Sequence, residues 1–346
     1  MEMYLLLLLA AVLLWFFLPR RQYVGTVTAL HALAGALRHP HLTGDLMKYH
    51  WQFLNPDAVE NGKNMGFFLL MQMISALSGN NYQLLLAVIA VLSALGAGYV
   101  LGRFCPEPWL GFLAWNCLGF YIGSFSAIKQ ALAMALLLLA YVGMEEGNFR
   151  KFLFWTLLAG FVHQPALVFL PAYGLTRLRF DRWTAVGYLL TGAALWAFRE
   201  EAVALVARLY YGEIPLAAQG GPGGRFWLFA LILAAGWVIK GTENAEFSRL
   251  CHLMALGVLL QMLSVYGNLF TRLADYYLQF AILFLPQMLA EPDGAVLPFD
   301  DISRKLFRTA AALGLLWFYW HTCLNVPAAY STDNYVNYQF FWEIRS

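Results

Sequence analysis

The chain has 346 residues, of which 61% are hydrophobic and only 12% charged, and its formal net charge is +2. Soluble domains carry roughly 25% charged residues, and so small a net charge argues against a nucleic-acid partner. Many runs approach the about 20 apolar residues that cross a bilayer core. The composition therefore predicts an all-α, polytopic helical membrane protein, with residues 1–346 forming one integral domain in the lipid bilayer.

Apolar runs in chain order predict about 10–12 membrane segments. Residues 3–18 lack a basic start and a cleavage site, so we expect a retained first span. The segment 65–78 is short, which favours a re-entrant or interfacial helix. The complete set is 3–18, 22–37, 65–78, 82–101, 109–125, 127–144, 152–175, 183–198, 225–239, 249–267, 273–290 and 306–323.

The run 152–175 has two interpretations. As one helix it would be about 36 Å long, enough to cross the membrane with tilt. Pro165 removes a backbone donor and breaks or kinks a helix, which favours a re-entrant helical hairpin with its tip at His163. The hairpin also gives the better distribution of Lys and Arg on the cytoplasmic side.

The same Lys/Arg bias places three polar segments outside the cell. These are an outer polar loop at 38–63, an outer loop with an amphipathic part at 199–224, and an aromatic outer tail at 324–346. The unusual polar residues of the apolar runs then fall on this side too.

Lys129 and His163 are the first candidates for chemistry, because ionisable residues are costly in membrane segments. Ser126, Lys129 and Gln130 are spaced to share a helix face, where the ammonium could hold a phosphate. The alternative is a lysine reaching toward headgroups. His163 could transfer a proton, or could be a core histidine bonded to a carbonyl that Pro165 frees.

Arg272 lies in a polar stripe with helical spacing, which favours a water-filled cavity or a bundle interior. The stripe is Gln261, Ser264, Asn268, Arg272, Asp275, Tyr276 and Gln279. Arg272 could grip a phosphate, or could form a structural pair with Asp275. A carboxylate of the 38–63 loop could act as a general base. The carboxylates in this loop are Asp45, Asp57 and Glu60, and Arg38 and Tyr49 are further site candidates there.

The order of these short motifs resembles the EpsG family of Wzy-like exopolysaccharide and O-antigen polymerases, over roughly residues 25–290. The matching residues are Arg38, Gly44, Asp45 and Tyr49; Gly66, Phe67 and Leu70; Ile128, Lys129, Gln130, Leu132 and Ala133; Ala159, His163 and Ala166; and Arg272, Tyr276 and Tyr277. Two positions depart from the family: Lys129 replaces the usual arginine, and Lys63-Asn64-Met65 lacks the acid that often precedes the Gly-Phe run, for which Glu60 could substitute.

The resemblance implies a glycosyltransferase of the cell (inner) membrane that joins undecaprenyl-diphosphate-linked oligosaccharide units, with a lipid-linked donor and acceptor and no metal or cofactor. His163 or Asp45 would accept the proton, and a chain-length regulator and a flippase are candidate partner proteins. The substrate-binding set would be Lys129, Gln130, Arg272, Arg38, Tyr49 and Tyr276. Two alternatives stay open, a lipid-linked oligosaccharide flippase or other transporter, and a membrane O-acyltransferase.

Overall fold

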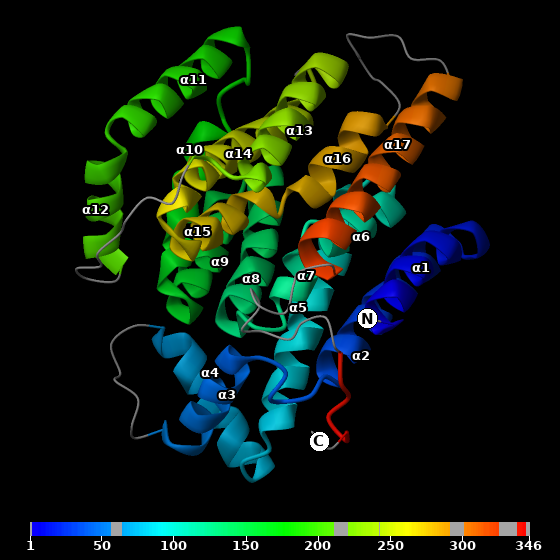
Figure 1. Cartoon of the computed structure of the whole chain (residues 1–346), viewed down its shortest axis with the longest axis vertical. Helices are drawn as coiled ribbons and strands as arrows, with labels where there is room; N and C mark the ends of the chain where they lie inside the picture. Colours follow the sequence, from blue (N-terminus) through cyan, green and yellow to red (C-terminus); the bar gives the residue numbers. More distant parts are fainter. Residues whose placement is uncertain are drawn as a thin grey trace. The chain divides into compact units, whose positions relative to one another are not determined.

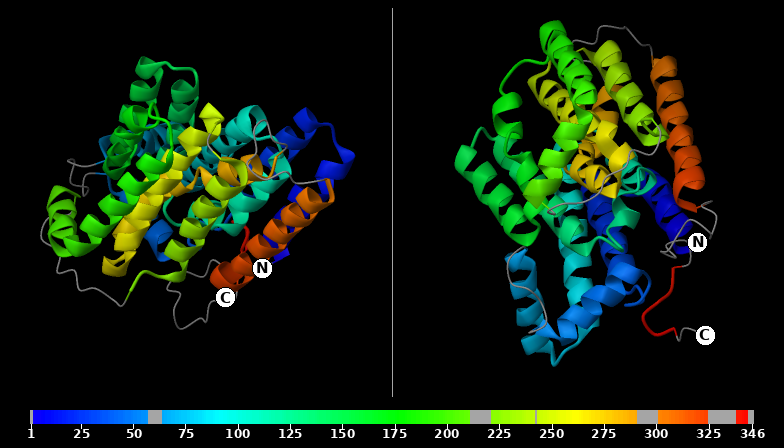
Figure 2. Two further views of the ribbon diagram at one scale, coloured as in Figure 1. Left: turned by 90° about the horizontal axis from the view of Figure 1, so that it is seen from above. Right: turned by 60° about the vertical axis from the view of Figure 1, so that its left-hand side comes forward.

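The computed structural model describes residues 2–56, 64–210, 221–241, 243–290, 301–324 and 338–343. Within these ranges the chain is helical and forms no sheet, and an isolated bridge joins Arg38 to Phe340. The predicted all-α class is therefore confirmed. The chain divides into two compact units, residues 1–164 with 305–346 (unit 1) and residues 165–304 (unit 2), both drawn in Figures 1 and 2. The prediction of a single integral domain stays a prediction.

Unit 1 is built around α5, against which α2 and α8 pack (Figure 1). A Cβ on Gly98 of α5 would overlap Thr28 of α2, and one on Gly96 would lie 3.0 Å from Ala135 of α8. Small residues therefore set both contacts. The helices are α1 Glu2–Phe17, α2 Arg20–Ala36, α3 Gly44–Leu54, α4 Met65–Ser78, α5 Tyr82–Phe104, α6 Pro108–Cys117, α7 Phe120–Gly123, α8 Ile128–Glu145, α9 Phe149–Val162 and most of α17 Asp301–Tyr319, which is followed by a π-helical turn at Trp320–Leu324.

Unit 2 is centred on α14, which packs against α13 and α15 and has α11 beside it (Figure 2). Gly257 of α14 lies against Leu278 of α15, and Gly236 of α13 lies against Phe284 of α16. The helices are α10 Ala172–Leu175, α11 Arg182–Ala197, α12 Arg199–Tyr210, α13 Gly224–Lys240, α14 Ala245–Met262, α15 Asn268–Leu278 and α16 Ala281–Leu289, with 3₁₀ turns at Gln164–Phe169 and Leu263–Tyr266.

Several helix starts are fixed by short-range capping bonds. The side chain of Asn148 accepts from the backbone N–H of Lys151 at the start of α9, at 3.0 Å. Asp181 and Thr184 form a capping box at the start of α11. Such caps satisfy backbone donors that have no intrahelical partner, so the sequence predicts these boundaries locally.

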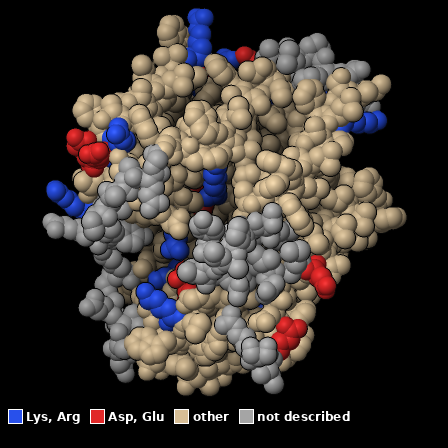
Figure 3. Space-filling view, in the orientation of Figure 1, with Lys and Arg blue, Asp and Glu red and all other residues tan. Residues whose placement is uncertain are grey.

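The surface and the helix lengths identify a multi-pass membrane protein. Three of the described helical segments are long and apolar enough to cross a bilayer, namely Tyr82–Phe104, Ile128–Glu145 and Ala245–Tyr266. Large apolar side chains stand exposed, among them Leu77 at 83% and Leu189 at 74%. Charged side chains cover little of the face drawn in Figure 3. Such surface suits lipid rather than water.

Some predicted spans are interrupted. The run 109–125 divides into α6 and α7, because Gly119 takes a φ of +85°. The run 273–290 divides into α15 and α16 near Gln279. The predicted outer loop 199–224 begins with the helix α12, which corresponds to the amphipathic part that the sequence indicated. The sequence did not predict these two helix breaks, because a long apolar run does not show where its backbone turns.

The run 152–175 is broken at the predicted place. Helix α9 ends at Val162, and His163 has an extended backbone with φ −147° and ψ +101°. A 3₁₀ turn and the short helix α10 follow. The single-helix alternative is therefore excluded, and the reversal of direction that defines a hairpin stays a prediction.

Candidate functional site

Arg38 follows the end of α2 and is almost completely buried in unit 1, with 1% of its surface exposed. Its guanidinium carbon lies 4.9 Å from the centre of the Phe125 ring. Its Nε and Nη2 atoms have no hydrogen-bond partner among the described residues. Burial lowers the pKa of this guanidinium, and the nearby tyrosines, Tyr82 first, oppose the shift. A buried cation with spare donors is suited to an anion.

Helix α3 turns Asp45 and Tyr49 toward the same region of unit 1. Thr43 caps this helix by accepting from the N–H of Leu46. The hydroxyl of Ser126 donates to Oδ2 of Asp45 at 3.3 Å, and Tyr49 is buried with 9% exposed. Because α3 is a helix, the i, i+4 spacing places the Asp45 carboxylate and the Tyr49 phenol on the same helix face.

Lys129 lies among aromatic rings. Its ammonium is 4.9 Å from the ring centre of Tyr49, 5.6 Å from that of Phe68 and 5.7 Å from that of Phe67. The three rings come from α3 and α4, whereas Lys129 lies in the first turn of α8. Ring faces attract a cation through their quadrupole, so these three rings orient the ammonium. Gln130, the next residue, is buried with 5% exposed.

His163 ends α9 next to the start of α4. The backbone N–H of Gln164 donates to Oδ1 of Asn64 at 3.0 Å, and Asn64 occupies the N-cap position of α4 with φ +64°. A Cβ on Gly66 would overlap the ring of Phe161. The His-Gln segment and the Gly-Phe run therefore meet, and the helix that carries Phe67 and Phe68 is fixed to the His163 turn.

Unit 1 therefore assembles four motifs that are far apart in the sequence. They are the Arg38–Tyr49 segment, the Gly66–Phe68 run, the Ser126–Gln130 segment and the His163–Gln164 turn. The sequence had predicted each of them separately. Asp57 and Glu60, the other loop candidates, lie outside the described residues.

The remaining candidates belong to unit 2. Arg272 is exposed on α15, and Tyr276 is fully buried there. Asp275 forms a half-buried ion pair with Arg225 of α13 at 2.5 Å. The predicted polar stripe does not follow one helix, because Gly267 has a φ of +130° between α14 and α15. Gln261 therefore lies in α14 and Ser264 in the 3₁₀ turn that follows it, whereas Asn268, Arg272, Asp275 and Tyr276 lie in α15.

Sequence reasoning missed Arg225, Asn64 and the part played by Phe68. Arg225 opens a long apolar helix directly after a glycine-rich run, and a lone cation at such a position was a usable signal. The ring contact of Phe68 with Lys129 carries no sequence signal, because it depends on how α4 packs against α8 and α3.

Comparison with known proteins identifies the chain's family. The family model described as "EpsG family" matches residues 22–340. That range includes all the candidate residues of both units. No curated protein and no solved structure matches the chain at a significant level.

Proposed function

Because the chain belongs to the EpsG family of membrane proteins, which implies a role in exopolysaccharide biosynthesis, we propose that it is a polysaccharide polymerase. It would join undecaprenyl-diphosphate-linked oligosaccharide repeat units at the outer face of the cell membrane. The growing chain would be the donor, and a new lipid-linked unit would be the acceptor. A flippase that delivers the units and a chain-length regulator would be its partner proteins.

The observation that supports this proposal is the cluster around Lys129. A cation held by Tyr49, Phe67 and Phe68 stands in the same region as Asp45, which the Ser126 hydroxyl contacts. A positive group for a leaving diphosphate and a carboxylate for an acceptor hydroxyl are the two requirements of glycosyl transfer from a lipid diphosphate. Unit 1 supplies both.

The proposed reaction uses these groups in a single transfer. The acceptor hydroxyl attacks the anomeric carbon of the donor's first sugar, and a new C–O bond forms. The bond from that carbon to the diphosphate oxygen breaks, and lipid diphosphate leaves with the electron pair. Lys129 stabilises the negative charge that develops on the leaving oxygens. Asp45 or His163 accepts the proton of the acceptor hydroxyl.

Other residues would bind the substrates. Gln130 and Tyr49 flank or contact Lys129 and would hydrogen-bond sugar or phosphate oxygens. Arg38 offers buried donors to an anion, and Arg272 offers an exposed guanidinium on α15. Tyr276 would support α15 from the interior, because its side chain is fully buried.

The test is incubation of the purified protein with lipid-linked repeat unit, followed by electrophoresis of the products. The wild-type protein should give a ladder of polymers. Lys129→Ala should lower the rate about 10²–10³-fold, the usual cost of removing a group that stabilises developing charge. Lys129→Arg should restore most of the rate, since family members usually carry arginine at this position.

Lys48→Ala is the matched control, because Lys48 is an exposed lysine of α3 in the same segment, and it should leave the rate unchanged. A normal ladder from Lys129→Ala would contradict the proposed role of Lys129. Transport of the lipid-linked unit across vesicles without any ladder would favour the flippase, and acyl transfer to a sugar would favour the O-acyltransferase.

A further inference from the structure

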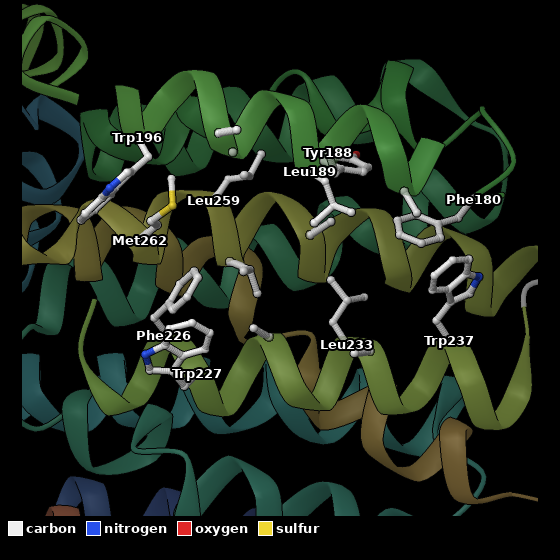
Figure 4. A pocket seen from close by; sticks show the side chains of 17 residues that line it. Phe180, Tyr188, Leu189, Trp196, Phe226, Trp227, Leu233, Trp237, Leu259 and Met262 are labelled. Carbon is white, nitrogen blue, oxygen red and sulfur yellow. The ribbon is translucent and has the colours of Figure 1, made fainter. Parts of the chain in front are cut away.

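Unit 2 contains an apolar cavity of about 550 Å³ between α11, α13 and α14. Figure 4 shows side chains of these helices, among them Leu189 and Leu233, pointing toward one another across it. Its lining is almost entirely apolar, so the acyl chains of bulk lipid would fill it as well as any other hydrocarbon. The cavity therefore indicates no particular occupant. Unit 1, in contrast, contains a buried charged group whose surroundings do indicate a ligand class.

The guanidinium of Arg38 is buried in unit 1 without a counter-charge. A Cβ on Gly35 of α2 would lie 3.7 Å from its Nη1 atom, and its carbon lies 4.9 Å from the Phe125 ring centre. Within the part of the chain that the structure describes, Nε and Nη2 have no hydrogen-bond partner and no carboxylate pairs with the group. A buried charge is costly unless it is paired, so an anion that reaches this guanidinium should bind strongly.

Three phenols around Arg38 supply no negative charge. Phenols are neutral near pH 7. Each of these hydroxyls already donates to a backbone carbonyl, at 2.8–3.0 Å, and they belong to Tyr82, Tyr121 and Tyr338. A planar guanidinium with open donors matches the oxygens of a phosphate. The surroundings of Arg38 therefore suit a phosphate-bearing ligand.

The C-terminal residues 338–343, which we name the C-terminal strap, lie directly beside Arg38. Phe340 is the residue opposite Arg38 in the isolated antiparallel bridge. Two backbone hydrogen bonds flank this pair, at 2.8 and 2.9 Å, and join residues 37–39 to residues 339–341. Figure 1 draws the strap in red near the C-terminus. The strap therefore pairs with the backbone that carries the buried guanidinium.

Tyr338 makes the strap part of the wall around this guanidinium. Its hydroxyl donates to the carbonyl of Ala34, near the end of α2, at 2.8 Å. Its ring lies edge-on to Tyr4 of α1 at 6.0 Å and 6.3 Å from the ring of Phe125. Arg38 contacts the same Phe125 ring, so displacing Tyr338 opens the space beside the guanidinium.

The strap is also the most weakly attached part of this wall. A single bridge joins it to unit 1, and its Phe341 and Trp342 are exposed. The helices α2 and α5, in contrast, pack against each other along their length through positions such as Gly98. Isolated strand pairs are marginally stable, and weakly packed segments open first. The strap can therefore lift while the helices stay in place.

We propose that the C-terminal strap is a lid over an anion site at Arg38, and that it lifts to admit the diphosphate of the lipid-linked saccharide. Only the identity of the anion rests on the proposed function. Ser126 directly follows Phe125 and contacts Asp45, so the Arg38 site adjoins the cluster around Lys129. The lid thus controls when a phosphate group reaches the second cation of unit 1.

The experiment measures how fast phenylglyoxal modifies Arg38 in the full-length protein in detergent, with mass spectrometry of the peptides. The exposed Arg150 is the internal reference and should react rapidly in every variant. Arg38 should react slowly in the wild type. Tyr338→Ala removes the hydroxyl bond and the ring contacts, and should raise the Arg38 rate at least about tenfold.

Phe341 offers a matched pair of variants at one position. It is the second residue of the turn in which the Glu343 N–H donates to the Phe340 carbonyl at 3.1 Å, where proline is favoured. Phe341→Pro removes the N–H that donates to Leu37. It should raise the Arg38 rate about 2- to 13-fold, the effect of one hydrogen bond on an opening equilibrium. Phe341→Ala keeps this N–H and should match the wild type.

Two outcomes of the modification assay would overturn the lid. One is an equal Arg38 rate in the wild type, Tyr338→Ala and Phe341→Pro. The other is a faster Arg38 reaction in both variants that is accompanied by maleimide labelling of Cys117, which is buried in unit 1. That labelling would attribute the exposure of Arg38 to unfolding.

Inorganic pyrophosphate tests the anion site. At saturation it should slow the modification of Arg38 in the Phe341→Pro protein at least about tenfold, because a bound ligand excludes the reagent, and leave Arg150 unchanged. No protection of Arg38 would overturn the anion site. Equal protection by phosphatidylglycerol vesicles at the same phosphate concentration would assign the site to bulk lipid headgroups and overturn the inference.

Polymerisation assays separate this inference from the proposed function. A closed lid reduces the apparent affinity by the fraction of open protein, so Phe341→Pro should lower the KM for the lipid-linked unit and Phe341→Ala should not. A normal wild-type ladder with an unchanged Arg38 rate in every variant would overturn the lid alone. Opening of the strap and protection by pyrophosphate, without any ladder from the wild type, would overturn the proposed function alone.

Discussion

Single residues in unit 1 show how a membrane protein can hold a cation ready for an anion. Lys129 is placed by three rings, and Arg38 lies against the Phe125 ring. Each such contact stabilises a cation by about 0.5–2 kcal/mol, which is enough to orient it within the site. The rings around Lys129 should therefore matter for substrate affinity as well as for folding.

Tyr49→Leu should lower kcat/KM for the lipid-linked unit about 2- to 30-fold, which is the effect of losing about 0.5–2 kcal/mol of cation–ring attraction. Initial rates at low substrate concentration measure it. Tyr49→Phe keeps the ring and removes only the hydroxyl, so it should lose less of kcat/KM than Tyr49→Leu. An equal loss in both variants would assign the effect to the hydroxyl instead.

His50 on α3 predicts a pH dependence of stability. Its ring is stacked on Tyr82 at 4.5 Å, and its Nδ1 lies 2.7 Å from Nε2 of His41. Burial, and then the positive form of His41, lower the pKa of His50 from its ordinary value of 6.5. The folded protein therefore binds fewer protons than the unfolded chain just below this pH, and stability falls as pH decreases through it.

Thermal unfolding in detergent between pH 8 and pH 5, a range spanning the ordinary histidine pKa, measures this effect. Tm should decrease on acidification, and His50→Gln should decrease less. An identical pH profile for the two proteins would show that His50 makes no contribution.

At the scale of elements, the contact between α4 and α9 connects the His163 turn to the rings around Lys129. Asn64 accepts from the Gln164 N–H at the start of α4, and Gly66 lies against Phe161. The absence of a side chain at Gly66 allows the two helices to approach closely. A larger residue there should move Phe67 and Phe68 relative to the ammonium.

Gly66→Ala should destabilise the protein by about 1–3 kcal/mol, the usual cost of overpacking, and should also lower the polymerisation rate. The backbone of Phe161 lies 3.0 Å from the added Cβ, so a change of ring rotamer alone cannot relieve the clash. Thermal unfolding and the ladder assay measure the two effects.

Gly25→Ala is the control on α2, because a Cβ at Gly25 has no other atom within 4 Å. Alanine favours a helix more than glycine does, so this variant should be unchanged or slightly more stable. A Gly66→Ala protein as stable as the wild type would refute the close-packing argument.

For the whole molecule, the distribution of Lys and Arg predicts its orientation in the membrane. The turn between α8 and α9 holds a surface network in which Glu146 pairs with Arg103 and Lys151. Those two cations lower the pKa of the Glu146 carboxylate, chiefly through the Lys151 hydrogen bond. The positive-inside rule places this turn and the start of α11 in the cytoplasm, and α3 outside.

Cysteine labelling of intact cells tests this orientation. Cys105, Cys117 and Cys251 are buried, so a variant in which Cys323 is serine is a suitable background. A membrane-impermeant maleimide should label Lys48→Cys directly. It should label Arg150→Cys and Arg182→Cys only after permeabilisation. All three positions are exposed, and the reverse pattern would invert the predicted topology.

The sequence by itself determined the class, the positions of most helices and the motifs of the site. In lipid, the backbone N–H and C=O groups of an apolar run must form hydrogen bonds within a helix. Caps such as Asn148 and Asp181 act within a few residues. The break at His163 was also predictable, because Pro165 acts on its own helix.

Only the tertiary structure decided which residues meet. The rings around Lys129, the Asn64–Gln164 bond, the Arg225–Asp275 pair and the cavity between α11, α13 and α14 join segments that are far apart in the chain. The Asn64–Gln164 bond, for example, lies where α4 and α9 pack closely through Gly66. Hydropathy reports how favourably a segment enters lipid, and it carries no information on which neighbour that segment then contacts.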